Sequence, residues 1–353
     1  MLEVDRLLAD CLHDARTEPL GTVPLVPEGP AYRAARRTFL AAGLRALRDD
    51  LPETGWTQLN LTAAPGGLPA LYRRLRDTGR ELTGSGAARD FFFMHKPPGL
   101  RVRFLARPEP GGTAALRETL VRRFRPAGDE WAPPVAGVYE PETYLFGGAR
   151  SMPWAHRLFT ADSFAWLDHH GCPPEGTDGG PRPAGWRVSL TLLRAVFDGL
   201  GIVGWEDRGV WQVVREETGR RLADGMRSPD RERAAAGVRA YWRQSSDERL
   251  AGFPPAWRDL LSTHQEALHE AASAWRTGYF DSGDAAIGPR RAAAHFVVFH
   301  WNRGRFSAGR QSLLTEALAD GGRGDGGQEN GGQENGGQES GGRGDGGRGD
   351  GPA

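Results

Sequence analysis

The sequence has few cysteines, almost no lysine and no long hydrophobic run. Of its 353 residues, 45 are acidic and 45 basic, and a single lysine, Lys96, leaves 44 arginines. Cys11 and Cys172 lie far apart in the chain, which excludes a disulfide framework and a zinc knuckle. No apolar stretch approaches the ~18 residues that a membrane span needs. The balanced charge argues against nucleic-acid binding.

The start of the chain and the cysteine content indicate a compartment. Residues 1–20 are acidic and amphipathic, without the basic start or small-residue cleavage site of a signal peptide. Two distant cysteines favour a reducing environment. We therefore expect a cytoplasmic protein that does not associate with membranes.

Common cofactor and catalytic signatures are missing from the sequence. It has no GxGxxG after a strand, no GxxxxGK[ST], no HExxH and no GxSxG. Asp168, His169, His170 and Cys172 are close in sequence. Neighbouring helical residues point about 100° apart, so this group favours an exposed helix end over a metal site. We expect no metal and no cofactor.

The C-terminal segment differs in composition from the rest of the chain. Residues 321–350 are six glycine-rich polar pentads, and residues 321–353 hold 16 of the 50 glycines. Such a sequence buries too little apolar surface to offset the entropy of ordering. We predict one catalytic domain over residues 1–320 and a disordered tail over residues 321–353.

Hydrophobic periodicity predicts both helices and strands in residues 1–320. Predicted helices span 32–49, 68–78, 113–125, 153–170, 186–200, 229–250, 257–277 and 307–318. Predicted strands span 56–61, 91–94 and 100–105, residues 137–146 are predicted to be extended, and the apolar segment 290–303 is interpreted as a strand. Strands come early and helices late, which favours an α+β fold, a single domain with a mixed sheet and packed helices.

Three stretches place polar side chains among apolar ones. They are LRVRF at 100–104, YEPETY at 139–144, and HFVVFHWNR at 295–303. In a strand, Arg101 and Arg103 share one face. Because buried polar groups need partners, these stretches indicate either a core network or a pocket wall.

In this order and spacing, these stretches resemble the C-terminal domain of class I lantibiotic dehydratases, which also occurs free-standing in thiopeptide biosynthesis. The opening strand WTQLNL, the acidic-Ser pair Asp162-Ser163 and the pair Asn302-Arg303 extend the resemblance over roughly residues 55–315. The resemblance implies a fold like the elimination domain of these dehydratases. It also implies one of two activities: elimination of glutamate from glutamylated Ser/Thr, or formation of the thiopeptide pyridine ring by a formal 4+2 aza-cycloaddition.

Two departures from the family pattern favour the second activity. The eliminating members are expected to use an Arg and a His at the positions occupied here by Leu145 and Val298. Elimination needs a base for the α-proton and a cation for the departing carboxylate. His300 could replace the missing imidazole if the register shifts by two, which on a strand would keep it on the same face.

The resemblance therefore predicts a cofactor-independent pyridine synthase that joins two dehydroalanines of a modified precursor peptide, then loses water and expels the leader. A glutamate-eliminating lyase of a split dehydratase and a non-catalytic leader-binding subunit are the alternatives. The partners are the leader-bearing precursor and other thiopeptide biosynthesis enzymes. The predicted catalytic residues are Tyr139, Tyr144, His300, Asn302 and Arg303, and the predicted substrate-binding residues are Arg101, Arg103, Trp154, Ser163 and Trp301.

Leader binding is a separate prediction. Leaders of this kind are typically acidic, and the first predicted helix carries Arg33, Arg36 and Arg37. These arginines could attract an acidic leader, although a solvated helix face is the more common role of such a pattern.

Overall fold

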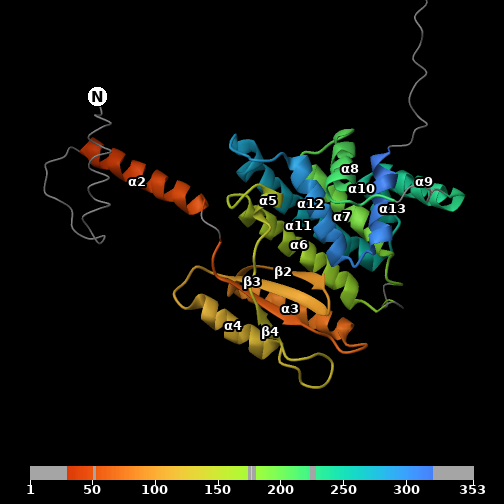
Figure 1. The fold of residues 1–353 in the computed structure, drawn as a ribbon, viewed down its shortest axis with the longest axis horizontal. Coiled ribbons are helices and arrows are strands. Elements are labelled where there is room, and N and C mark those ends of the chain that lie inside the picture. The colour runs from red at the N-terminus through yellow and green to blue at the C-terminus, as the bar shows by residue number, and fades with distance from the viewer. Residues whose placement is uncertain (1–29, 51–52, 174–175, 177–179, 223–227, 321–353) are drawn as a thin grey trace, which may run out of the picture. The chain divides into compact units, whose positions relative to one another are not determined.

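The computed structural model describes residues 30–50, 53–173, 176, 180–222 and 228–320 (Figure 1). The strands are β1 Trp56–Leu61, β2 Ala88–Lys96, β3 Gly99–Ala106 and β4 Val135–Gly137. The helices are α2 Pro30–Asp50, α3 Leu68–Ser85, α4 Gly112–Arg123, α5 Thr143–Phe146, α6 Met152–Gly171, α7 Gly185–Gly199, α8 Glu206–Glu217, α9 Pro229–Arg243, α10 Ser246–Ala251, α11 Pro255–Gly278, the short 3-10 helix η1 Phe280–Ser282, α12 Pro289–Arg303 and α13 Ala308–Ala319.

The four strands form one antiparallel sheet in the order β2-β3-β1-β4, where a mixed sheet was expected. One face of the sheet is apolar and carries Phe91, Phe93, Val102 and Phe104. α3 packs on this face, and a Cβ on Gly79 would lie 2.8 Å from the Phe91 ring. Glycine at this position therefore lets the helix approach the sheet closely.

Helix α6 covers the outer edge of β2. The Phe91 N–H donates to Thr160 Oγ1 at 3.1 Å, and the Phe93 N–H donates to Ser163 Oγ at 3.4 Å. Edge strands expose unpaired backbone groups that must find partners. Ser163, predicted to bind substrate, is fully buried and serves as such a partner.

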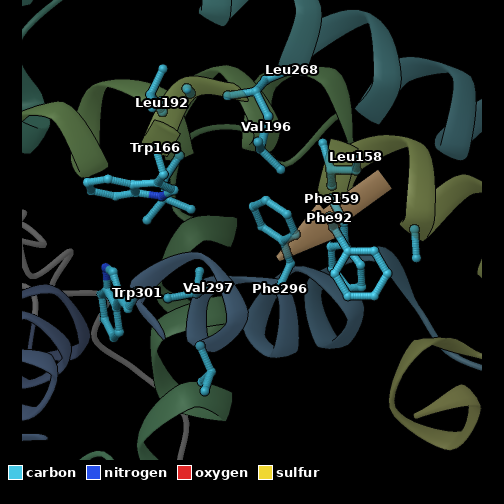
Figure 2. Close-up of a cluster of buried hydrophobic side chains, with 14 of the residues drawn as sticks. Phe92, Leu158, Phe159, Trp166, Leu192, Val196, Leu268, Phe296, Val297 and Trp301 are labelled. Atoms are coloured by element: carbon cyan, nitrogen blue, oxygen red, sulfur yellow. The ribbon is translucent and has the colours of Figure 1, made fainter. Parts of the chain in front are cut away.

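The helices enclose the main apolar core, and β2 contributes to it. α6 packs against α11, α11 against α7, and both α12 and α13 against α8. In Figure 2, Phe159 of α6, Phe296 of α12 and Phe92 of β2 lie together in this core. The Phe159 and Phe296 ring centroids are 6.2 Å apart and the rings are stacked. The result is a mostly helical α+β domain with a small antiparallel sheet, and the predicted α+β class is confirmed.

Two predicted extended segments are wrong. Residues 290–303, interpreted as a strand, form helix α12, which begins at Pro289 and includes Ala292, Ala293 and Ala294. Proline is favoured in the first turn of a helix and alanine has the highest helix propensity. Within 137–146, only the start belongs to a strand, and α5 forms a single helical turn that ends at Gly147 in the left-handed region.

The second half of the chain is more finely divided than predicted. Helix α8 was not predicted, and the predicted helix over 229–250 consists of α9 and α10. Between them Ser245 and Glu248 form a capping box, in which each side chain accepts a hydrogen bond from the backbone N–H of the other. A capping box starts a new helix and so ends the previous one.

Candidate functional site

The second face of the sheet carries polar side chains on β1 and β3, beside Phe92 of β2. Antiparallel pairing places Arg103 beside Gln58 and Arg101 beside Asn60, so all four side chains lie on this face. We call these four residues the polar face. The alternation of LRVRF predicts the shared face of the two arginines, and the strand pairing confirms it.

Arg103 is held in place on the polar face. Its side chain is 6% exposed, and Nε donates to Gln58 Oε1 at 2.8 Å. Its guanidinium lies 5.0 Å from the Phe92 ring centroid and 4.6 Å from that of Tyr139. The Gln58 side chain fits beside its partner Gly137 on β4 because glycine has no side chain. A Cβ on Gly137 would lie 2.4 Å from Gln58 Nε2.

A buried hydrogen-bonded relay lies beside Arg103. The Tyr139 hydroxyl is 2.7 Å from His156 Nε2, and His156 Nδ1 is 2.5 Å from Glu53 Oε2. Since the Glu53 carboxylate accepts, His156 donates through Nδ1 and its Nε2 accepts from Tyr139. Arg89 also forms an ion pair with Glu53. We call Tyr139, His156 and Glu53 the relay.

Burial fixes the protonation of the relay. It raises the pKa of Tyr139, an effect that Glu142 reinforces and Arg103 opposes. Burial also lowers the pKa of His156 to about 3, against the opposing effect of Asp90. Both groups are therefore neutral near pH 7, and the relay presents an uncharged phenol next to the guanidinium of Arg103.

A second buried network centres on Asp162 of α6. His300 Nδ1 lies 2.6 Å from Asp162 Oδ1, and Arg303 Nε donates to Asp162 Oδ2 at 2.5 Å. His300 Nε2 lies 2.9 Å from Ser189 Oγ, and Trp301 Nε1 donates to the same oxygen at 3.1 Å. His300 and Trp301 are fully buried, so both belong to the helical core (Figure 2 for Trp301) and not to an open pocket wall.

Charge pairing holds the Asp162 network together. Burial by itself would raise the pKa of Asp162, but the charges and hydrogen bonds of His300 and Arg303 lower it below its usual value. Burial lowers the pKa of Arg303, and Asp162 opposes that effect. Arg303 Nη1 also lies 3.4 Å from the Met94 sulfur of β2, so this network reaches the strand that borders the polar face.

The structure brings only some of the predicted site residues together. Arg101, Arg103 and Tyr139 are neighbours, and the charges of Arg101 and Arg303 both act on Arg103. The Tyr144 side chain is 78% exposed. Asn302 uses its carbonyl to accept from His95 Nδ1 at 2.9 Å.

The remaining predicted residues lie elsewhere. The Trp154 ring faces the Arg157 guanidinium at 5.0 Å and packs close to Gly278 of α11. Arg33, Arg36 and Arg37 lie on α2, and leader binding by them stays a prediction.

The interpretation of residues 168–172 as an exposed helix end is wrong. His169 and His170 are 6% and 8% exposed, and each lies within hydrogen-bonding distance of a backbone carbonyl, that of Pro183 at 3.0 Å and that of Arg303 at 2.8 Å. Asp168 is buried and bonded to His264 at 2.9 Å. In the described part of the chain, no group of three or more His, Cys, Asp or Glu is arranged to hold a metal ion.

Sequence reasoning missed Glu53, His156 and Gln58. Gln58 had a signal, because it alternates with apolar residues in WTQLNL as Arg103 does in LRVRF. Glu53 and His156 are separated by 103 positions and come together only in the folded chain.

Among the described residues, no helix is both long and apolar enough to cross a membrane.

Residues 56–319 match the family model described as the lantibiotic biosynthesis dehydratase C-terminal domain, so the chain belongs to this family. The resemblance drawn from the sequence motifs is confirmed at this level. No curated protein matches the chain.

Several solved structures are similar to it, among them MibB and TsrL. The tRNA-dependent lantibiotic dehydratase MibB from Microbispora sp. 107891 aligns with a TM-score of 0.51 and 18% identity over 76% of this chain. The aligned part spans 28% of the MibB chain, so the likeness concerns one part of that enzyme and its fold. TsrL aligns with a TM-score of 0.48 and 16% identity, over 75% of this chain and 93% of its own.

Proposed function

We propose that this protein is a pyridine synthase that acts on a leader-bearing peptide and joins two dehydroalanines by a formal 4+2 aza-cycloaddition. Loss of water and of the leader as a carboxamide then gives the aromatic ring of a thiopeptide macrocycle. Membership of the dehydratase C-terminal family supports a role on such peptides. The finer assignment depends on the chemistry that the described residues offer.

The burial of His300 is the observation that carries this proposal. Val298 stands where the eliminating relatives are expected to have a His, and α12 is helical, so a residue two positions away points about 200° from it. His300 is engaged by Asp162 and Ser189 and is fully buried. The other imidazole of α12, His295, lies 3.7 Å from Glu217 of α8. Both imidazoles of α12 thus face side chains of other helices, which supports ring formation over elimination.

The relay also suits hydrogen bonding better than proton removal. Tyr139 holds its proton and His156 resists gaining one, because burial shifts both pKa values away from neutrality. The Tyr139 oxygen can accept from a substrate amide N–H, and Arg101 and Arg103 can donate to carbonyl oxygens. Holding two dehydroalanines in contact can contribute about 7–11 kcal/mol through effective molarity alone.

Two parallel incubations, one for each candidate substrate, test the proposal. The purified protein is mixed with a synthetic leader peptide carrying two dehydroalanines, and separately with one carrying glutamylated serine. We expect the first to lose water and its leader as a carboxamide by mass spectrometry, and the second to be unchanged. Dehydroalanine formed from the second peptide, with no change in the first, would assign the eliminating activity instead. Tight binding with no mass change in either would assign a non-catalytic subunit.

A further inference from the structure

Two adjoining cavities lie apart from the polar face. The first has a volume of 780 Å³ and lies between α3, the end of α6 and the chain that follows α12. The second has a volume of 540 Å³ and lies beside the turn between β2 and β3. Leu68 and Arg305 line both, so we treat them as one feature and call it the double cavity.

The walls of the double cavity carry positive charge. Five basic side chains line it: Arg73, Lys96, Arg182, Arg305 and Arg310. Of the described residues that line it, none is acidic. Like charges gathered in a concave, partly apolar wall raise the local potential and attract anions.

Arg305 has an unusual backbone conformation at the junction of the two cavities. Its φ is +58°, and it is the one non-glycine residue with positive φ in the part of the chain that the structure describes. This region disfavours side chains with a Cβ. Arg305 lies two residues after the end of α12, and its backbone N–H donates to the Asn302 carbonyl at 3.2 Å. This conformation carries the Arg305 guanidinium into the wall that both cavities share.

A rigid group of aromatic rings supports the cationic wall. The Tyr72 hydroxyl lies 2.7 Å from His95 Nε2, and the Tyr72 ring stacks on that of His170 at 4.8 Å. The two histidines lie within hydrogen-bonding distance of the carbonyls of Asn302 and Arg303, which fixes the end of α12 and the residues after it. Burial raises the pKa of Tyr72 to about 12, against the opposing charges of Arg305 and Arg182. Both guanidinium groups therefore act on the same hydroxyl.

The second cavity borders the start of β3. Leu100 lines this cavity, whereas the next residue, Arg101, points to the opposite side of the strand and lies on the polar face. Apolar side chains such as Leu68 and Phe306 share the wall with the arginines, which suits a peptide with both acidic and apolar residues better than a nucleic-acid backbone.

We infer that the double cavity binds an acidic segment of the peptide substrate, with Arg182 and Arg305 as partners of its carboxylates. The inference rests on the proposed function only in taking a peptide as the substrate. The guanidinium fork matches the geometry of a carboxylate and binds it with two parallel hydrogen bonds. The reacting dehydroalanines, which carry no charge, would lie at the polar face.

A binding assay with a charge-matched control tests this inference. The probes are a fluorescent hexaglutamate peptide and its hexaglutamine counterpart, measured by anisotropy at rising salt. The test variant is Arg182→Gln/Arg305→Gln. The control is Arg233→Gln/Arg243→Gln on α9, which removes the same charge elsewhere. We expect the test variant to bind hexaglutamate at least about tenfold more weakly, and the control to bind like the wild type. Binding of the wild type should weaken with salt.

Three results would overturn the inference. The first is equal affinity of wild type and test variant for hexaglutamate, and the second is equal affinity of the wild type for both peptides. The third is displacement of labelled hexaglutamate by a single-stranded RNA at a lower concentration than unlabelled hexaglutamate needs. Because Arg182 Nη1 also donates to the Cys172 carbonyl, Arg310→Gln is measured as a second variant that leaves this contact intact, and a loss of hexaglutamate affinity is expected there too. Binding is read without turnover, so an inactive protein that still binds hexaglutamate would reject the proposed function and keep the cavity assignment.

Discussion

Two tyrosines of the YEPETY stretch differ only in their surroundings. Tyr139 is packed against Arg103 and donates to His156, whereas the Tyr144 side chain is 78% exposed. A phenol that keeps its proton and has fixed neighbours can orient a substrate, while an exposed one loses that order to solvent. Tyr139 is therefore the residue on which the proposed chemistry depends most.

Replacing the Tyr139 hydroxyl tests that role. Tyr139→Phe removes one hydrogen bond and leaves His156 Nε2 without its donor, so we expect a stability loss of about 1–2 kcal/mol. We expect kcat for ring formation to fall about 10- to 100-fold, measured by mass spectrometry of timed reactions. Tyr144→Phe is the matched control and should change neither quantity. Equal kcat values for the two variants would remove Tyr139 from the site.

For individual helices and strands, some sequence patterns were sufficient to predict the structure and others were not. The alternation in LRVRF was sufficient to place Arg101 and Arg103 on one face, because side-chain period alone decides that. The apolar pattern of residues 290–303 was not sufficient to tell helix from strand, because a short buried helix and a buried strand both give continuous apolar runs. The relay joins Glu53 before β1 to His156 in α6, and no local pattern connects two elements that meet only through tertiary packing.

Helix α12 is joined to α6 by a buried charge pair, and this junction can be tested. Asp162→Asn would leave the Arg303 guanidinium buried without its counter-charge, so we expect a loss of about 3–5 kcal/mol in the free energy of unfolding. The control Asp230→Asn breaks the exposed pair with Arg233 and should cost less than about 1 kcal/mol. Urea denaturation measures both.

A double substitution separates pairing from packing at the same junction. In Asp162→Asn/Arg303→Met the uncompensated charge is gone, so we expect recovery of part of the lost stability. If Asp162→Asn alone unfolds no more easily than the control, the pair does not join the two helices energetically.

At the scale of the whole molecule, the buried histidines make folding depend on pH. Burial lowers the pKa of His95 and His169 to about 4 and that of His156 to about 3, and lowers that of His170 well below its usual value. In the unfolded chain these imidazoles titrate near 6.5. Between these values the unfolded state binds more protons than the folded state, so acid favours unfolding.

We therefore expect the free energy of unfolding to fall as the pH drops from about 6.5 towards 4, by up to ~1.4 kcal/mol per pH unit for each such histidine. Urea denaturation between about pH 7 and pH 4.5 measures the slope. His170→Gln should reduce it, because one of the groups that resists protonation is removed. His269→Gln, which changes an exposed imidazole, should leave it unchanged. A flat profile in the wild type would contradict the expectation.

Gly137 shows how a small site restricts distant positions of the chain. It sits on the edge strand β4 and makes no contact with substrate groups in the proposed chemistry, yet a methyl group there would collide with the Gln58 amide. Displacing that amide would release Arg103 from its only side-chain hydrogen bond among the described residues. Alanine at position 137 would thus impair turnover while leaving every proposed reacting group intact, and variation at this site is limited by chemistry two strands away.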